Sequence, residues 1–344
     1  MTVTRILSTI LIPVLAVVFG LSGTATALSE STDAKDAIVF SRQLGLWPAN
    51  IWRTTVDGTY KRQLTYLGGV NPVWSPNGEK LVFTNPLSQR LQVMGANGAV
   101  NNLTPRLGHL QESSPSWSSD GKRLAFVREQ QKSGLKEQAI VIVNADGSNE
   151  ILAADWSSTA KYSSPSWSPD GRYIVYEKAE VQGSSLYVAD LTLHTARLLT
   201  KKSDSTANSL VSWSPSGKKI LYNDSDNEIY TIWPDGTHRS TIADGDSYDA
   251  SWSPDGRKIV FLESHSGEGV SISSSDGTVT QLLVEQGQYE SIEKPIWSPD
   301  SQSILFAMTD SSAPRPTQDL FVLSLRDSHA MIKVAHRITG GYDW

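Results

Sequence analysis

Short apolar runs, each preceded by a tryptophan and a tight-turn sequence, return along nearly the whole chain. The clearest copy has Trp-Ser-Pro-Asp-Gly at 167–171 and then the apolar run Ile174–Tyr176. Pro fixes φ at the second turn position and Gly takes the left-handed conformation of a bulged hairpin loop, so each copy predicts two strands joined by a turn. The copies recur at intervals of 39 to 50 residues. Their tryptophans are Trp74, Trp117, Trp167, Trp213, Trp252, Trp297 and Trp344.

Each repeat is long enough for four strands. After the apolar run, a third segment alternates apolar and polar residues in most copies, as in Leu186–Ala189. In five of the seven repeats this segment ends in an Asp-Gly or Asn-Gly turn, and a fourth strand follows. A repeat of about 45 residues made of short strands and Gly-rich turns is typical of a β-propeller blade. We therefore predict an all-β fold, a β-propeller of four-stranded blades.

The two ends of the chain predict how the ring closes. The apolar run Ile38–Phe40 has no tryptophan strand before it, and Tyr342–Trp344 has no apolar run after it. Each end supplies what the other lacks, so we expect the C-terminal strand to complete the first blade and to leave no open sheet edge. This gives a seven-bladed propeller over residues 37–344. A six-bladed ring with irregular ends is the alternative.

The recurring tryptophans have a structural interpretation. One large ring at a fixed position of every blade buries much apolar area where neighbouring sheets meet. We therefore expect all seven tryptophans to be core residues between blades rather than an array that stacks on sugars.

The N-terminal sequence predicts export. Arg5 precedes an apolar run from Ile6 to Leu21, and Ala25-Thr26-Ala27 has the form of a signal-peptidase site. The run is interrupted by Pro13 and is shorter than the roughly 20 residues needed to cross a bilayer. We expect a signal peptide at 1–27, a flexible leader at 28–36, and a mature protein that is periplasmic or secreted and does not span the membrane. An uncleaved anchor helix is the alternative.

Composition excludes several kinds of site. The chain has no cysteine, hence no disulfide, no thiol nucleophile and no lipidated cysteine. A net charge of −6 argues against nucleic-acid binding. The six histidines, which show no metal-ligand spacing, are His109, His194, His238, His265, His329 and His336. We predict no metal and no cofactor. Calcium at the acidic segments 223–228 or 244–249 is the alternative to ordinary turns there.

The pattern W-S-P-D-G-[KR]-x-[IL]-x-[FY], at 167–176 and 252–261, resembles the TolB-type propeller repeat over about residues 37–344. TolB proteins are periplasmic, carry an α/β domain before a six-bladed propeller, and bind partners such as a peptidoglycan-associated lipoprotein and colicins. This chain differs in its seven repeats, and it leaves no room for that domain between Ala27 and Ile38. The resemblance implies the propeller alone and a binding role. The same repeat also builds propellers of peptidases and of oligogalacturonate lyases, whose site is a His-rich manganese centre.

An enzymatic function is the second hypothesis. The chain lacks the Gly-x-Ser-x-Gly elbow of the peptidase relatives, which disfavours a hydrolase. A carboxylate pair for glycoside chemistry is conceivable at Glu290 with Glu293, or at Glu112 with Asp249 across the ring. The alternative function is therefore an enzyme acting on polysaccharide in the central channel. A third possibility is a structural unit that docks another subunit.

We expect the binding surface on one particular face of the ring. The connections from the second to the third strand of a blade, among them the expected loops 128–138 and 177–185, and the connections from each blade to the next have unequal lengths and lie on one face. Variable loops on a rigid scaffold commonly bind ligands. The predicted contacts are Trp47, Glu112, Tyr162, Tyr248, Asp249, Glu293 and Tyr342. The sequence thus predicts a monomeric, non-enzymatic module that binds a protein or peptide in the cell envelope.

Overall fold

A computed structural model describes residues 37–104, 110–200, 210–224, 226–264, 269–285, 291–310, 317–326 and 329–344. The predicted signal peptide and leader, together with His109, His265 and Glu290, lie outside these ranges.

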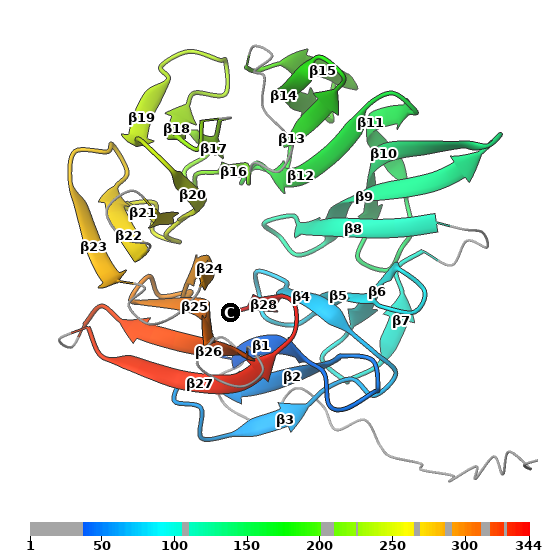
Figure 1. Cartoon of the computed structure of the whole chain (residues 1–344). Helices are drawn as coiled ribbons and strands as arrows, with labels where there is room; N and C mark the ends of the chain where they lie inside the picture. Colours follow the sequence, from blue (N-terminus) through cyan, green and yellow to red (C-terminus); the bar gives the residue numbers. More distant parts are fainter. Residues whose placement is uncertain are drawn as a thin grey trace, which may run out of the picture.

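The described strands form seven four-stranded antiparallel sheets arranged in a ring (Figure 1). Blade 1 comprises β28 (Tyr342–Asp343), β1 (Ala37–Arg42), β2 (Asn50–Thr55) and β3 (Lys61–Gln63). Blade 2 comprises β4 (Val70–Trp74), β5 (Leu81–Asn85), β6 (Arg90–Met94) and β7 (Val100–Asn102). Blade 3 comprises β8 (Leu110–Trp117), β9 (Arg123–Lys132), β10 (Leu135–Asn144) and β11 (Ile151–Ser157). Blade 4 comprises β12 (Lys161–Trp167), β13 (Tyr173–Glu180), β14 (Gly183–Asp190) and β15 (Thr195–Leu198).

The remaining three blades follow the same order of strands. Blade 5 comprises β16 (Ser212–Trp213), β17 (Ile220–Asn223), β18 (Ile229–Ile232) and β19 (Ser240–Ala243). Blade 6 comprises β20 (Ser247–Trp252), β21 (Lys258–Glu263), β22 (Gly269–Ser274) and β23 (Thr280–Glu285). Blade 7 comprises β24 (Ser291–Trp297), β25 (Ser303–Asp310), β26 (Thr317–Ser324) and β27 (Met331–Ile338). The first strand of each blade lies nearest the axis (Figure 1). None of the described segments is a helix long and apolar enough to cross a membrane.

The ring closes through its first blade, as the sequence predicts. Strand β28 pairs antiparallel with β1, with Tyr342 opposite Phe40 and Asp343 opposite Val39. The Ser41 amide donates to the Gly341 carbonyl at 3.1 Å, which extends the pairing by one bond. The seven-bladed prediction is confirmed, and the six-bladed alternative is wrong, because the chain ends do form a complete four-stranded sheet.

The recurring turn has the geometry that its sequence predicts. In blade 4, Gly171 has φ +69° and its amide donates to the Ser168 carbonyl at 2.9 Å. The Ser168 hydroxyl donates to Asp170, and the same hydroxyl accepts the Tyr173 amide at 2.8 Å. The Asp170 carboxylate accepts the Arg172 amide at 3.0 Å. Serine and aspartate side chains thus replace the ladder bonds that the turn interrupts.

The recurring tryptophans lie at the junctions between blades, where the apolar core is concentrated. The Trp117 indole N–H donates to the Val73 carbonyl of blade 2 at 3.2 Å. The equivalent donor of Trp167 bonds Ser116 of blade 3 at 3.1 Å. A ring that fills the junction and also bonds the preceding inner strand fixes the spacing of neighbouring blades.

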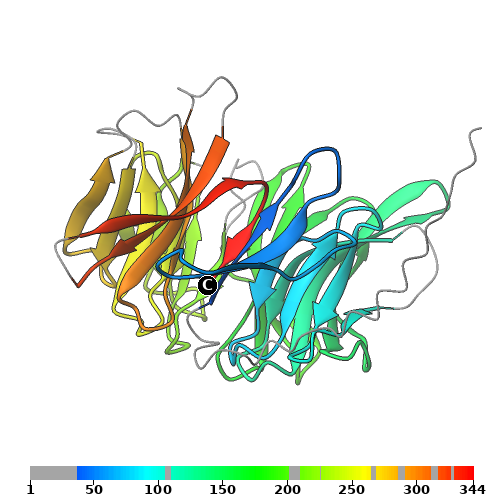
Figure 2. The same ribbon diagram turned by 90° about the horizontal axis from the view of Figure 1, so that it is seen from below.

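Two expected loops are instead extensions of strands. The segments 128–138 and 177–185 were expected to be loops, but β9 and β10 continue to the two-residue turn Ser133-Gly134, and β13 and β14 to Val181-Gln182. Ser133 and Gly134 have φ of +51° and +82°, the signs of a type I′ hairpin turn, which suits strand twist. Figure 2 shows the strands of the blades running between the two faces of the ring.

Candidate functional site

Three loops meet over blades 1 and 2, on the face that carries the connections between second and third strands and between blades, here called the loop face. Residues 43–49 join β1 to β2, residues 64–69 join β3 to β4, and residues 86–89 join β5 to β6. Gly68 lies where they converge: its φ is +97°, and a Cβ there would stand 3.0 Å from Pro86 and 3.7 Å from Pro48. Only glycine adopts this conformation in so narrow a space without strain.

Hydrogen bonds from side chains and backbone hold these loops against each other. The Asn50 carboxamide oxygen accepts the Gly68 amide at 3.1 Å and the Thr65 hydroxyl at 3.2 Å. The Gly69 amide donates to the Ala49 carbonyl at 2.8 Å, and Asn85 donates to the Leu67 carbonyl. The propeller therefore fixes the conformation of these loops, although their outer side chains are exposed to solvent.

Large apolar side chains stand almost fully in solvent on these three loops. We call them the apolar patch; its members and their exposed fractions are Leu46 (101%), Trp47 (78%), Tyr66 (75%), Leu67 (84%) and Leu87 (75%). Isolated exposed apolar residues are ordinary, but several on adjoining loops mark interaction surfaces. Trp47, predicted as an interface anchor, is one member of this patch.

Three other predicted contacts converge at the wall of the central channel. Asp249, Glu293 and Tyr342 lie on β20, β24 and β28, the inner strands of blades 6, 7 and 1. The Tyr342 hydroxyl is buried and donates toward the carbonyls of Glu293 and Lys294. Burial raises the pKa of the Asp249 carboxyl, and a backbone hydrogen bond from Lys294 opposes this rise. Tyr342 thus links blade 1 to blade 7 by hydrogen bonds, and its buried ring is not available to a partner.

A backbone irregularity recurs along this channel wall. The residue three positions before the tryptophan has positive φ in five blades: Asn71, Ser114, Ser164, Asp249 and Lys294. At these positions the pairing of the first and second strands shifts register. A bulge of this kind re-aims a side chain and bends the strand. The repetition shows that it belongs to the blade design rather than to one site.

The Asp343 carboxyl makes the stability of the protein depend on pH. Burial raises the pKa of its carboxyl to about 6, although Trp74 donates its amide to Oδ2 at 2.7 Å. Because the folded state disfavours the ionised form, stability is highest below the unfolded pKa near 4 and declines as pH rises through about 6. We expect a loss of about 1–3 kcal/mol between pH 4 and pH 7 from this group.

Asp343→Asn should remove that decline and exceed the wild type in stability at pH 7, since the amide oxygen still accepts the Trp74 amide. Urea unfolding at pH 4 to 8 measures it, with the exposed acid Asp226→Asn as a control. Parallel stability profiles for wild type and Asp343→Asn would contradict the assignment.

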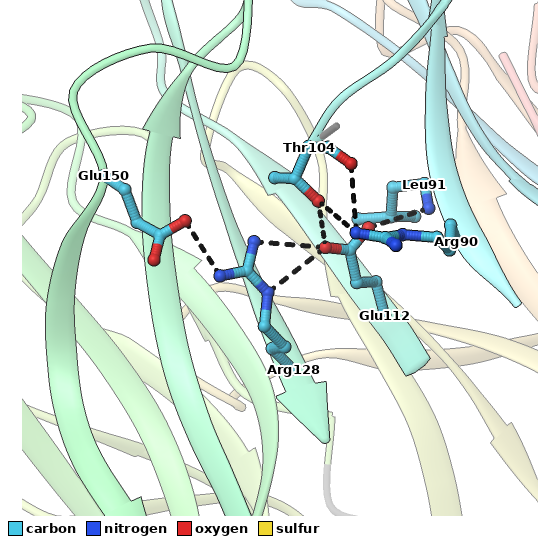
Figure 3. Close-up of polar contacts among 6 residues, drawn as sticks. All are labelled: Arg90, Leu91, Thr104, Glu112, Arg128 and Glu150. Carbon is cyan, nitrogen blue, oxygen red and sulfur yellow. Dashed lines mark hydrogen bonds and ion pairs between the residues drawn. The ribbon is translucent and has the colours of Figure 1, made fainter. Parts of the chain in front are cut away.

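Glu112 is fully buried between blades 2 and 3 (Figure 3). Its carboxylate accepts two bonds from Arg128, at 3.1 and 3.2 Å, and one each from the Thr104 hydroxyl and the Leu91 amide. Arg128, also buried, makes a second ion pair with Glu150 at 2.8 Å. A buried carboxylate that accepts four hydrogen bonds, two of them from an arginine, serves the packing of two blades. In this structure it is not placed to contact a partner or to act in a glycosidase pair with Asp249.

The two remaining tyrosines pack within blade junctions. Tyr162 is buried, meets Tyr176 edge to face at 5.9 Å, and donates its hydroxyl to the Asp155 carbonyl at 3.0 Å. Tyr248 is partly buried against the core between blades 6 and 7. Of the seven predicted contacts, the structure places Trp47 and the Glu293 side chain in solvent and leaves the rest partly or fully buried.

In one of the two segments considered for calcium, 223–228, the Asp224 carboxylate makes internal contacts. Asp224 accepts the amides of Asp226 and Glu228 and pairs with Arg239 at 3.2 Å. Asx side chains that bond their own backbone form turns. Within the described ranges no three His, Cys, Asp or Glu side chains converge as a metal site. That the protein uses no metal and no cofactor remains a prediction.

Hollows also occur between blades away from the patch. One of about 650 Å³ separates blades 4 and 5 on the opposite face, here called the turn face, and Tyr173, Arg197 and Trp213 contribute to its lining. The Tyr173 and Trp213 rings stack there at 6.2 Å.

Sequence reasoning missed four of the five patch residues. Leu46, Leu67 and Leu87 adjoin glycine or proline, and Tyr66 adjoins Leu67, in segments without strand periodicity. A large apolar residue within two positions of a glycine or proline, in a segment without strand periodicity, is the signal that could have found them.

Comparisons with known proteins agree with the fold. The family described as "TolB beta propeller domain" matches residues 15–180 and 122–320. No curated protein matches the chain.

Among solved structures, TolB from Acinetobacter baumannii aligns with a TM-score of 0.54 at 16% identity, covering 89% of this chain and 81% of that one. An oligogalacturonate lyase from Vibrio parahaemolyticus aligns at 0.66 and 10% identity, covering 85% and 92%. A puromycin-hydrolysing peptidase from Mycobacterium tuberculosis aligns at 0.65 and 15% identity, covering 92% of this chain but 56% of the peptidase. These likenesses show the propeller fold.

Proposed function

Because the chain belongs to the TolB β-propeller domain family, we propose that it is an exported, non-enzymatic binding module that holds a protein or peptide of the cell envelope. The observation that carries this proposal is the apolar patch on the loop face. A rigid ring that exposes one tryptophan, one tyrosine and three leucines on adjoining loops has the composition of an interface core.

The structure of the patch supports a preformed interface. The loops are tied together by hydrogen bonds of the Asn50 side chain and of the backbone, so little conformational entropy is lost when a partner covers them. Trp47 and Tyr66 are the residue types that dominate binding energies, because they bury large areas with few rotatable bonds. The three leucines would surround these anchors and exclude water.

An envelope location is part of the same proposal. It is supported by the apolar N-terminal run with its Ala-x-Ala sequence and by the family of the propeller. A TolB propeller that acts by binding partners needs a preformed binding surface and no catalytic residues.

Replacing two members of the patch should weaken capture of a partner without affecting the fold. We expect Trp47→Ala combined with Leu67→Ser to weaken capture by at least about 10-fold, since hot-spot side chains each contribute a kcal/mol or more. Val279→Ser is the matched control, because Val279 is also exposed but is on the turn face. The measurement is crosslinking in native envelopes, quantified by mass spectrometry, together with the melting temperature.

Two results would count against this proposal. One is capture of the same proteins, at the same level, by the double variant. The other is loss of capture by Val279→Ser to the same extent as by the double variant.

A further inference from the structure

The junction between blades 4 and 5 has few hydrogen bonds across it (Figure 1). Among the described residues one such bond occurs, from the exposed Arg197 guanidinium of blade 4 to the Pro234 carbonyl of blade 5. Between blades 3 and 4, in contrast, the side chains of Trp167, Arg123 and Ser119 each donate to a carbonyl of the other blade. The apolar side chains of blades 4 and 5 therefore pack together with little polar contact between the blades.

The recurring tryptophan of blade 5 does not bond blade 4. In blades 2, 3, 4 and 7 the indole N–H of this tryptophan donates to a carbonyl of the preceding blade. The indole N–H of Trp213 is buried and has no hydrogen-bond partner within the described ranges, and the same is true of Trp252 and Trp344. A buried donor without an acceptor destabilises the folded state. Trp213 thus fills its junction without the bond that fixes it elsewhere.

A basic residue crosses the two neighbouring junctions. Six residues after its tryptophan, blade 3 has Arg123, which lies 4.4 Å from the Trp167 ring and donates to the Gly171 carbonyl of blade 4 at 2.8 Å. At the same position blade 5 has Lys219, which donates to the Ser275 carbonyl of blade 6 at 3.0 Å. In both cases a cation of one blade binds the backbone of the next.

Blade 4 has a tyrosine at this position. Tyr173 stacks on Trp213 at 6.2 Å, and in the part of the chain that the structure describes its hydroxyl does not bond blade 5. Gly217, the counterpart of Gly171, instead lines the hollow of about 650 Å³ between the two blades. The blades are therefore less closely packed on the turn-face side of this junction than a filled interior would be.

A buried carboxylate faces the same junction. Val175 and Leu186 pack with Val211 of blade 5, and Glu177 lies two residues after Val175 on β13, hence on the same face of the sheet. Glu177 is 1% exposed. One of its oxygens accepts the Ser163 hydroxyl at 2.6 Å, whereas Oε1 has no partner among the described residues. A buried carboxylate without a counter-charge is costly, and water that reaches it when the blades separate removes part of that cost.

The junctions of blade 1, where the chain ends meet, have more polar contacts. The Tyr342 hydroxyl donates to carbonyls of blade 7. On the other side of blade 1, Trp74 donates its amide to Asp343 at 2.7 Å and its indole N–H to the Ala37 carbonyl at 3.0 Å. The closure of the ring is therefore linked by hydrogen bonds to both neighbouring blades.

We infer that the ring opens between blades 4 and 5: in the native protein these two blades separate transiently while the other junctions stay closed. Sub-global openings of this kind involve the parts of a fold that are least firmly held, and they need less free energy than global unfolding. The opening is a conformational property of the scaffold. It does not depend on the apolar patch, which lies over blades 1 and 2.

Labelling of single cysteines measures the opening, because the chain has no cysteine of its own. Val188 is 2% exposed and packs against blade 5; Ile142, 1% exposed, occupies the same position in blade 3 and packs against blade 4. The full chain is labelled with iodoacetamide as Val188→Cys or, for the matched control, Ile142→Cys. We expect Val188→Cys to react at least about 10-fold faster, since labelling of a transiently open state follows its population. Melting temperatures show that both variants are folded.

The wild type gives a second measurement without any substitution. Exchange of the indole N–H groups with deuterium is followed by NMR. Trp213 should exchange at least about 10-fold faster than Trp252 and Trp344. All three indole N–H groups are buried without a hydrogen-bond partner among the described residues, so a difference between them reports opening rather than bonding.

Tyr173→Arg tests whether a basic residue closes the junction. Its guanidinium can donate to the Gly217 carbonyl as Arg123 does at the junction before it, and the Asp170 carboxylate at the hollow offsets the added charge. In the Val188→Cys chain we expect this substitution to slow labelling about 5- to 10-fold, the effect of about one hydrogen bond.

Two further variants examine the carboxylate and the reverse exchange. Glu177→Gln removes the buried charge and should slow labelling of Val188→Cys by a similar factor. Arg123→Tyr removes the bond to Gly171 and should speed labelling of Ile142→Cys.

Equal labelling rates of Val188→Cys and Ile142→Cys would overturn the inference, and so would exchange of the Trp213 indole no faster than that of Trp252 and Trp344. It also fails if Tyr173→Arg and Glu177→Gln both leave the labelling rate unchanged. The patch variant Trp47→Ala with Leu67→Ser should not alter these rates, so the outcome is independent of the proposed function.

Discussion

Replacing Arg128 by methionine should lower the free energy of unfolding by about 3–5 kcal/mol, the cost of leaving a buried charge without its partner. Glu112 is fully enclosed and depends on Arg128 for two of its four hydrogen bonds. The Thr104 hydroxyl and the Leu91 amide cannot neutralise the carboxylate that remains. Urea unfolding at pH 7 measures this loss.

A double variant separates the ion pair from its surroundings. Glu112→Gln combined with Arg128→Met removes both charges, and we expect it to recover at least half of the lost stability, because a neutral amide is less costly to bury. Lys136→Met, which breaks an exposed pair with Glu129, should cost at most about 1 kcal/mol. If Arg128→Met unfolds within 1 kcal/mol of the wild type, the pair does not have the structural role described here.

Deleting Tyr342–Trp344 should have an effect of similar or greater size. The deletion exposes the edge of β1 and removes two aromatic side chains from the junction of blades 7 and 1. Removal of one large buried aromatic costs about 3–5 kcal/mol, so we expect a lower melting temperature and a tendency to aggregate through the free edge. Calorimetry and limited proteolysis of blade 1 measure the result.

Tyr342→Phe is the control for this deletion. It keeps the strand and the ring but loses the bonds of the hydroxyl to the carbonyls of Glu293 and Lys294, at a cost of about 1–3 kcal/mol. A deletion no worse than this substitution would show that β28 does not contribute to ring closure as the pairing indicates.

The fold could be predicted from the sequence because its determinants are local and repeated. Trp167, the Ser168–Gly171 turn and the run Ile174–Tyr176 specify a strand, a turn and a second strand within ten residues, and five further tryptophans start the same pattern. The incomplete copies at the two ends of the sequence predicted the number of blades and the way in which the ring closes. The prediction was wrong for segments that lack this motif and were assigned to loops. At Ser133-Gly134, for example, a two-residue turn joins two long strands of one hairpin.

The candidate site was less predictable because it depends on loops from different blades. Trp47 was selected for its residue type and loop position, but the loops that carry Tyr66 and Leu87 meet its loop at Gly68, which lies close to Pro48 and Pro86. Glu112 and Tyr162 were selected by the same reasoning, yet their partners Arg128 and Asp155 bury them. Distance along the sequence does not distinguish an exposed loop residue from one that a neighbouring blade covers.

The pairing of β28 with β1 also governs how the protein is made. Ser41 and Gly341, which share a hydrogen bond beside this pair, are 300 residues apart. At about 5–20 residues per second, synthesis of the intervening chain takes roughly 15–60 s, during which β1 has an unpaired edge. Blades 2 to 7 can assemble from local contacts in order, but blade 1 is completed last. The edge of β1 is therefore open to wrong strand pairing in the nascent chain until β28 has been synthesised.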